Sequence, residues 1–501
     1  MTQEQTTNSK QAAWIAIGSF FSFIVGIVSP MILSRYFDKA DYGTYKQVMY
    51  VYSSLLTIFT LGLPRAYAYF LPKHPQEYAK SIINKVTKIF FILGAIFSAF
   101  LLLCAGPISS VMNNPDLKTA LIVFSPTPFL LLPTLGLDAI YASFRKTKYL
   151  AIYTISTRIL TIAFTVLPVL IFSSNYLYAI IGFDIASLIT FLIALYLKTW
   201  PVRHIEPSKT KLSYKEIFSF SLPLLYASLW GIIIASSNQF FISRYFGNEV
   251  FADFSNGFME LPFVGMIIGA ISAILLPVFS GIDKGNGMAD ESLAIWKSAL
   301  IKSAKLIFPM LIFSIIFSDI VMRCMYGDMY SASSIYFKIK NFSGLFCILP
   351  FYPIILAIGK TRAYAHVHMI IAFLVVIAEW IVCKTLDSAI YIAIVSEVCH
   401  IFKIWLLMRV IADYAKQSII TLTQPKILLK LVILSSLSSV LPWIVLQYTD
   451  LNKFIAFAIS VTLFVICYYL LCIAMKVTYK EVFRGLFKGN AFFAKAERFI
   501  P

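Results

Sequence analysis

The chain has 501 residues, of which 59% are hydrophobic and only 13% are charged, and its formal net charge is +18. Soluble domains carry about 25% charged residues, so the composition excludes an ordinary soluble protein. Runs of about 20 apolar residues recur along the whole length, and each is long enough to cross a bilayer as a helix. They lack the alternating pattern of membrane β-strands, so we predict an all-α integral membrane protein.

About 14 apolar segments, taken in chain order, have the length of transmembrane helices. Their approximate bounds are 11–36, 45–71, 86–111, 119–142, 149–173, 176–197, 216–246, 252–281, 299–326, 331–359, 363–384, 388–412, 427–447 and 454–475. An even number of spans places both termini on one side of the membrane. Most of the 42 Lys and Arg residues lie in loops and helix ends on that same side. The side rich in these residues is cytoplasmic, so we expect both termini in the cytoplasm.

The first and seventh predicted spans end alike, with ILSRYF at 32–37 and FISRYF at 241–246. Six spans separate the two copies, so both have the same orientation in the membrane. This pattern predicts two parallel six-helix lobes related by an axis along the membrane normal. The predicted parts are an N-lobe at 1–198, a cytoplasmic linker at 199–215, a C-lobe at 216–413, two further helices at 426–475 and a basic amphipathic cytoplasmic tail at 476–501.

Several functional classes can be set aside. The predicted loops are short and the phosphate-binding pattern GxxxxGK[ST] is absent, which excludes an ATP-driven motor in this chain. We therefore expect a transporter and not an enzyme, with no catalytic residue, metal or cofactor. The seven cysteines form no CxxC pair and are expected to be buried thiols. The positive charge serves orientation and contact with anionic membrane lipids, so nucleic acid is not an expected partner.

Charged residues inside membrane spans are costly, so each is a candidate binding residue. The candidates for substrate binding are Arg35, Arg65, Arg158, Arg244, Glu260 and Lys338. Arg65 lies about 10 Å from the inner end of its span, at 1.5 Å per residue. Arg35 and Arg244 stand at helix ends, where their side chains could equally reach the outer lipid headgroups. A guanidinium group binds phosphate bidentately, so a pocket lined by arginines favours an anionic cargo.

Two carboxylates on adjacent predicted spans are candidates for ion coupling. Glu379 and Glu397 could bind a coupling ion, Na⁺ or H⁺, or form hydrogen bonds between helices, and the sequence leaves both interpretations open. Lys340 follows Lys338 by two residues. Residues i and i+2 do not share a helix face, so Lys340 is expected to point away from Lys338.

The segments ILSRYFDKADYGTYKQV at 32–48 and LGLPRAYAYFLPK at 61–73 resemble motifs of the Wzx-type polysaccharide and O-antigen flippases. These flippases belong to the MOP exporter superfamily, which includes the MATE exporters and the lipid II flippases. The repeat, the two additional spans and the chain length are similar to this superfamily over nearly the whole chain. The resemblance implies a V of two lobes around a central cavity, plus two C-terminal helices.

The resemblance also implies a function. Family members carry undecaprenyl-pyrophosphate-linked glycan repeat units across the cell inner membrane by alternating access, for O-antigen, capsule or exopolysaccharide assembly. Basic residues of the cavity hold the pyrophosphate. The motif match gives this role to Arg35 and Arg65, and to Arg244 as the counterpart of Arg35 in the second repeat. The choice of Arg158, Lys338 and Glu260 as candidates depends only on their depth in the membrane. Membrane lipids and other polysaccharide-assembly proteins are the further partners that this function implies.

Three alternatives are weighed against this function. Lipid II-type flippases have an Arg-rich second helix, which the single Arg65 does not reproduce. MATE-like multidrug or metabolite exporters commonly carry an Asp in the first span, whereas residues 11–37 hold no acid. A glycan polymerase or transferase needs a large outer loop, and the predicted outer loops are short. The driving force could be the membrane potential, an ion gradient or downstream consumption of the product, and the sequence leaves all three open.

Overall fold

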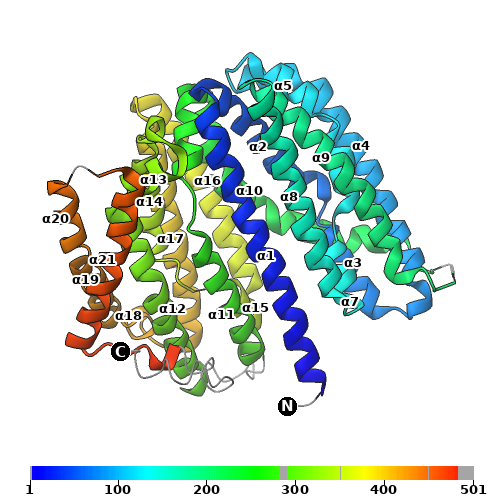
Figure 1. Ribbon diagram of the computed structural model, residues 1–501. Coiled ribbons are helices and arrows are strands. Elements are labelled where there is room, and N and C mark those ends of the chain that lie inside the picture. The colour runs from blue at the N-terminus through cyan, green and yellow to red at the C-terminus, as the bar shows by residue number, and fades with distance from the viewer. Residues whose placement is uncertain are drawn as a thin grey trace. The chain divides into compact units, whose positions relative to one another are not determined.

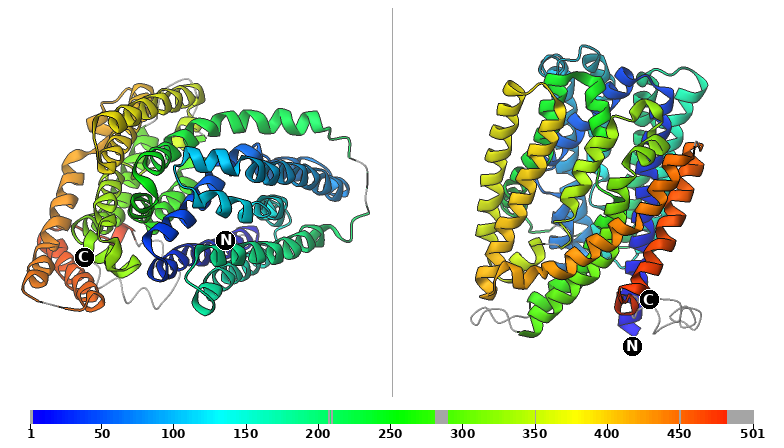
Figure 2. Two further views of the ribbon diagram at one scale, coloured as in Figure 1. Left: turned by 90° about the horizontal axis from the view of Figure 1, so that it is seen from above. Right: turned by 90° about the vertical axis from the view of Figure 1, so that its left-hand side faces the viewer.

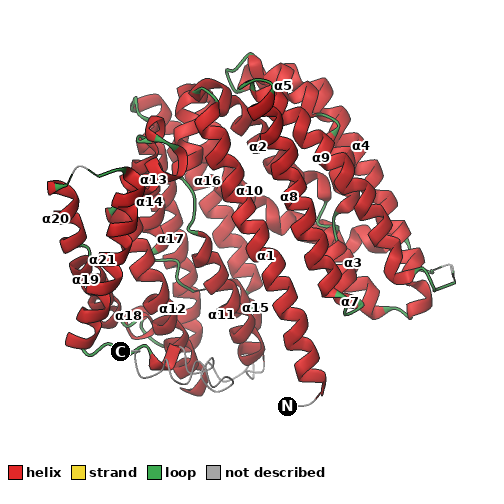
Figure 3. Cartoon of the chain, in the orientation of Figure 1, coloured by secondary structure: helices red, strands yellow, loops and turns green. Residues whose placement is uncertain are grey.

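The computed structural model describes residues 3–206, 208, 210–280, 290–349, 351–449 and 451–482. Every regular element within these ranges is a helix, and they contain no strand (Figure 3). The prediction of an all-helical chain is therefore confirmed. The chain divides into two compact units, Met1–Ala252 and Asp253–Pro501. All seven cysteines lie in the described ranges, and none of them forms a disulfide.

Within its described residues the first unit contains nine α-helices and most of a tenth, all of them except α6 labelled in Figure 1. They are α1 (Gln3–Tyr36), α2 (Lys39–Thr60), α3 (Pro64–Lys73), α4 (Ala79–Val111), α5 (Asp116–Phe124), α6 (Thr127–Leu131), α7 (Leu137–Ser143), α8 (Thr147–Ile171), α9 (Tyr176–Thr199) and α10 (Tyr214–Gly257). Within this unit α1 packs along α8, and α8 packs along α9. The predicted fourth span is divided into α5, α6 and α7 because Pro126, Pro128 and Pro133 interrupt its hydrogen bonding.

The second unit contains the remaining helices. They are α11 (Pro262–Ser280), α12 (Asp290–Ile316), α13 (Ser318–Tyr326), α14 (Ser333–Gly344), α15 (Phe351–Ala357), α16 (Thr361–Thr385), α17 (Ala389–Ala415), α18 (Ile419–Thr423), α19 (Pro425–Ser438), α20 (Val440–Tyr448) and α21 (Lys453–Ala474). The last three, orange and red in Figure 2, pack together, and α19 also packs on α12. The predicted amphipathic tail at 476–501 lies mostly outside the described residues.

The number of spans differs from the prediction. Within the described residues, 11 segments are long and apolar enough to cross a membrane, or 12 if the bent α10 is one span. The predicted count of 14 is therefore not confirmed. The two other predicted spans, 252–281 and 331–359, are interrupted between α10 and α11 and between α14 and α15. The first interruption ends at Pro262, and the residue before a proline disfavours helical conformation.

The two copies of the Ser-Arg-Tyr-Phe repeat each stand where a helix breaks. The helix α1 ends at Tyr36, and Asp38 then caps α2 by accepting a hydrogen bond from the backbone N–H of Asp41. The second copy is followed by Gly247, whose φ of 83° and ψ of 177° interrupt α10. The compact units divide within α10, ahead of Asp253, and not in the predicted linker at 199–215. The lobe boundaries stay a prediction.

The segment that follows the first copy packs against the second copy and the two residues after it, inside the first unit, and we call residues 40–47 and 243–248 the repeat junction. The side-chain amide of Gln47 donates to the hydroxyl of Ser243 at 2.7 Å. The amide of Asn114 donates in turn to Gln47 Oε1, and that of Asn248 donates to the carbonyl of Ala40 at 3.1 Å. Buried polar groups are therefore paired across the junction, as their desolvation requires.

Gly43→Ala tests how closely the repeat junction packs. A Cβ atom at position 43 would lie 2.1 Å from the carbonyl oxygen of Asn248. This oxygen belongs to the backbone, so no side-chain rotation can relieve the clash. We expect the variant to lose about 1–3 kcal/mol of stability, the usual cost of overpacking. Gly106→Ala is the control, because nothing lies within 4 Å of its added Cβ. Thermal unfolding of both variants in detergent measures the difference, and equal melting temperatures would contradict the close approach.

Candidate functional site

Arg65 lies in the first turn of α3, directly after the break that separates α3 from α2. Leu61 and Gly62 both have positive φ, at 50° and 71°, and Pro64 then starts the new helix. A Cβ at Gly62 would lie 2.7 Å from the carbonyl oxygen of Ser221, so the break packs tightly against α10. This packing fixes the start of α3, and the side chain of Arg65 is exposed there. Arg65 can therefore meet a ligand without displacing a core residue.

Arg158 is the second exposed arginine at membrane depth in the first unit. It lies on α8, and its Nε donates a hydrogen bond to the hydroxyl of Ser22 on α1 at 2.9 Å. Only one edge of the guanidinium is used in this bond. The other N–H groups of the fork keep their capacity to bind an anion.

Arg35 lies in the last turn of α1, and Arg244 lies just before the interruption of α10 at Gly247. Both side chains are exposed. Arg244 donates from Nη1 to the carbonyl oxygen of Ser110, in the last turn of α4, at 2.8 Å. A cation is favourable at a helix C-terminus, because the last carbonyl groups carry partial negative charge. Arg244 therefore has a structural role at the end of α4 in this conformation.

The second unit contains a buried charge cluster around Lys340. The ammonium group of Lys340 lies 3.0 Å from Glu397 Oε1 on α17 and 3.6 Å from Glu260 Oε1, just before α11. Glu397 also accepts a hydrogen bond from the hydroxyl of Ser343 and lies 3.7 Å from His400 Nδ1. The side chains of Lys340 and Glu397 are 13% and 6% exposed, whereas that of Glu260 is 69% exposed. Glu397 is thus the fixed partner of Lys340, and Glu260 is the displaceable one.

A small pocket of about 40 Å³ lies beside this cluster. Glu260, Lys340, Ser343 and His400 all contribute to its lining, and the ring of Phe258 lies 5.0 Å from the Lys340 ammonium group. The pocket therefore presents one cation, held between two carboxylates, to a space large enough for a few water molecules. An incoming anion could take the position of the exposed Glu260 carboxylate, while Glu397 stays in place.

The structure brings only some of the predicted residues together. Glu260 and Glu397 both lie close to the ammonium group of Lys340. The sequence predicts that Lys340 points away from the candidate Lys338. Lys338 is exposed on the same helix and lies outside the described pocket linings. Glu379 is fully buried on α16. The sequence did contain a signal that Lys340 faces other site residues, because Lys340, Ser343 and Gly344 share one helix face at spacings of three and four.

Comparison with solved structures shows which known proteins share this fold. The chain matches the lipid II flippase MurJ in an inward closed conformation with a TM-score of 0.69, over 94% of this chain and 99% of MurJ, at 16% sequence identity. It matches an inward-facing MATE family transporter of the MOP superfamily with a TM-score of 0.56, over 81% and 96% of the two chains, at 14% identity. The chain therefore shares the fold of these two solved structures.

Comparison of sequences gives the family. Residues 9–283, more than half of the chain, match the family described as Polysaccharide biosynthesis protein, and the chain belongs to this family. It is 22% identical over 380 residues to the capsular polysaccharide biosynthesis protein CapF of Staphylococcus aureus, covering 74% of this chain and 91% of CapF. It is 21% identical over 380 residues to a putative O-antigen transporter of Shigella flexneri, covering 72% and 87%. The predicted family is confirmed.

Proposed function

We propose that the protein is a flippase that moves polyprenyl-pyrophosphate-linked oligosaccharide repeat units from the inner to the outer leaflet of the cytoplasmic membrane. Its family membership is the observation that carries the proposal, because the family is named for polysaccharide biosynthesis and the two relatives for capsular polysaccharide biosynthesis and O-antigen transport. The product would serve O-antigen, capsule or exopolysaccharide assembly. The mechanism would be alternating access, with both termini in the cytoplasm.

Arginine chemistry supports an anionic cargo. Arg65 and Arg158 are exposed on membrane-spanning segments of the first unit, and Arg35 is exposed at the end of α1. Guanidinium groups stay charged when desolvated and match the oxygen spacing of phosphate. In this proposal Arg65 and Arg158 bind the pyrophosphate, and Arg35 adds positive charge at the edge of the binding site. Arg244 joins them only when it leaves the carbonyl of Ser110.

Within the second unit, Lys340 joins the predicted Lys338 as a candidate ligand for phosphate. A phosphate oxygen would replace the Glu260 carboxylate beside Lys340, because Glu260 is the more distant and the more exposed of its two partners. Glu397 would keep the lysine in position during this exchange. Glu379 and Glu397 remain the candidates for coupling to Na⁺ or H⁺.

Reconstitution into liposomes tests the proposal directly. The probe is an undecaprenyl-pyrophosphate-linked oligosaccharide placed in one leaflet, and a membrane-impermeant lectin measures its appearance in the other. We expect transfer to be at least tenfold faster with the protein than in protein-free liposomes. Parallel reactions with an imposed Na⁺ or H⁺ gradient identify the driving force. No acceleration under any gradient or membrane potential would overturn the proposal.

Lipid II-type transport is the second candidate, and the structural match to MurJ favours it. The same liposome assay separates the two functions when lipid II, with its disaccharide-pentapeptide head, replaces the oligosaccharide probe. Preference for lipid II would assign the protein to peptidoglycan assembly. Preference for the oligosaccharide would support the proposed function.

A further inference from the structure

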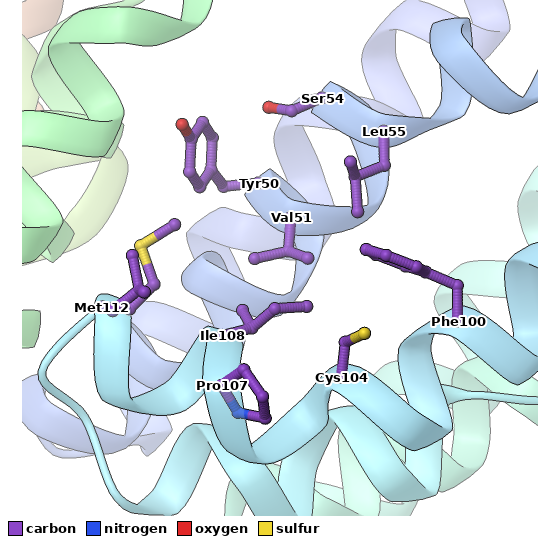
Figure 4. A pocket seen from close by; sticks show the side chains of 10 residues that line it. Tyr50, Val51, Ser54, Leu55, Phe100, Cys104, Pro107, Ile108 and Met112 are labelled. Carbon is purple, nitrogen blue, oxygen red and sulfur yellow. The ribbon is translucent and has the colours of Figure 1, made fainter.

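An apolar pocket of about 350 Å³ lies between α2 and α4 in the first unit. Figure 4 shows the side chains of both helices converging on it, with Tyr50 and Met112 toward one end and Phe100 toward the other. Ser54 and Cys104 are small residues in its walls. Pro107 lies at its rim and removes a backbone hydrogen bond from α4. Small side chains and a proline therefore leave space where two helices would otherwise pack closely.

The polar groups around this pocket are directed to α10 and not into the pocket. The hydroxyl of Tyr50 donates to the carbonyl of Ser236 at 3.0 Å, and Ser54 Oγ donates to Ser236 Oγ at 3.4 Å. Met112 Sδ accepts from the hydroxyl of Ser243 at 3.2 Å. The remaining surface is hydrocarbon and sulfur, so a polar or charged ligand would lose its hydration there without compensation.

Both helices belong to membrane-spanning segments, Lys39–Lys73 and Gln76–Val111. At this level of the protein the surrounding medium is the hydrocarbon of the bilayer. The lining of the pocket therefore favours an apolar chain as its ligand. A cavity of roughly 150 Å³ holds one benzene molecule. A volume of about 350 Å³ therefore suits about two isoprene units of similar size.

We propose that this pocket binds an isoprenoid segment of the polyprenyl tail of the transported lipid, an assignment that rests on the proposed function. Straight acyl chains are present in any bilayer and would compete for it. An isoprenoid chain has a rigid double bond and a methyl branch in every unit, so it loses less conformational entropy than a saturated chain when it is held in one shape. A pocket walled by fixed helices thus favours the isoprenoid.

Binding in this pocket is linked to the position of α10, because residues that line the pocket also contact α10. Tyr50 and Met112 line the pocket and also hydrogen-bond to α10. Ser243, the partner of Met112, is at the same time a member of the repeat junction. A chain that enters the pocket contacts the residues that hold α10 to α2 and α4. Tail binding and the position of α10 are therefore linked through shared side chains.

Photo-crosslinking tests the pocket without requiring transport. The probe is a diazirine-bearing undecaprenol, which has the tail but no phosphate, and octadecanol with the same diazirine is the straight-chain comparison. The purified full-length protein in nanodiscs is irradiated with each probe, and peptide mass spectrometry maps the adducts. We expect undecaprenol adducts within residues 50–55 and 100–112, at least fivefold more abundant than octadecanol adducts. Adducts elsewhere, or equal labelling by the two probes, would overturn the assignment.

Two substitutions on neighbouring residues sharpen the test. Cys104→Phe fills the pocket and should reduce undecaprenol adducts at least fivefold. Leu103→Phe is the matched control, because Leu103 is 78% exposed and does not line the pocket. If Cys104→Phe impairs folding, Ser54→Leu narrows the opposite wall and gives the same readout. Unchanged labelling in a folded pocket variant overturns the proposal. Pocket labelling in a protein that does not flip glycolipid would refute the proposed function alone.

Discussion

Arg65→Ala abolishes surface glycan in cells that depend on this protein, while the protein remains in the membrane at its normal level. The guanidinium of Arg65 is exposed at the start of α3, on a segment fixed by Gly62 and Pro64. A hydrogen bond to a charged group contributes about 1.5–3 kcal/mol. Losing one such bond to the pyrophosphate lowers affinity roughly ten- to a hundredfold. Surface glycan measured with a specific lectin or antiserum reports the loss.

Two control variants separate phosphate binding from a general effect of charge. Arg65→Lys keeps the charge but loses the bidentate fork, so we expect an intermediate level of glycan. Arg362→Ala removes an exposed arginine from the first turn of α16 and should leave glycan unchanged. Because Arg65 is exposed, its replacement by alanine should not lower the melting temperature. Wild-type glycan levels in Arg65→Ala would remove this residue from the mechanism.

The positions of the helices could largely be predicted from the sequence, because each run of apolar residues needs one membrane crossing. The breaks were harder to place. Pro126, Pro128 and Pro133 account for the division of the fourth predicted span into α5, α6 and α7. The interruption at Gly247 falls between the predicted spans 216–246 and 252–281, as the sequence predicts. The breaks that lower the number of continuous spans lie between α10 and α11 and between α14 and α15, inside the predicted spans 252–281 and 331–359.

For the candidate site, less could be predicted from the sequence than for the helices. The depth of a charged residue along a span could be predicted, but its direction around the helix could not. Lys338 and Lys340 lie at nearly the same depth, yet Lys338 is exposed and Lys340 is held by Glu397. The contacts of the repeat junction join residues about 200 positions apart, such as Gln47 and Ser243. Sequence similarity indicated the two copies but carried no information on this pairing.

Lys340→Met strongly destabilises the protein, and this is the larger of the expected stability effects. The substitution leaves Glu397, only 6% exposed, with the hydroxyl of Ser343 and the ring of His400 but without the ammonium group that lies 3.0 Å away. Removing one partner of a buried ion pair costs about 3–5 kcal/mol, because the remaining charge has lost its compensation. Thermal unfolding in detergent, followed by size-exclusion chromatography, measures the shift. Lys338→Met, at an exposed position on the same helix, should change stability by no more than about 0.5 kcal/mol.

A double-mutant cycle shows that the effect belongs to the pair and not to lost packing. Glu397→Gln alone leaves Lys340 with the more distant and exposed Glu260, and it too should destabilise the protein. The double variant Lys340→Met with Glu397→Gln removes both charges, and we expect it to recover at least about 2 kcal/mol relative to the sum of the single changes. Glu260→Gln should have little effect on stability, because that carboxylate is 69% exposed. Additive single effects would contradict a buried ion pair between Lys340 and Glu397, and a large loss in Glu260→Gln would contradict the view that Glu260 is the displaceable partner.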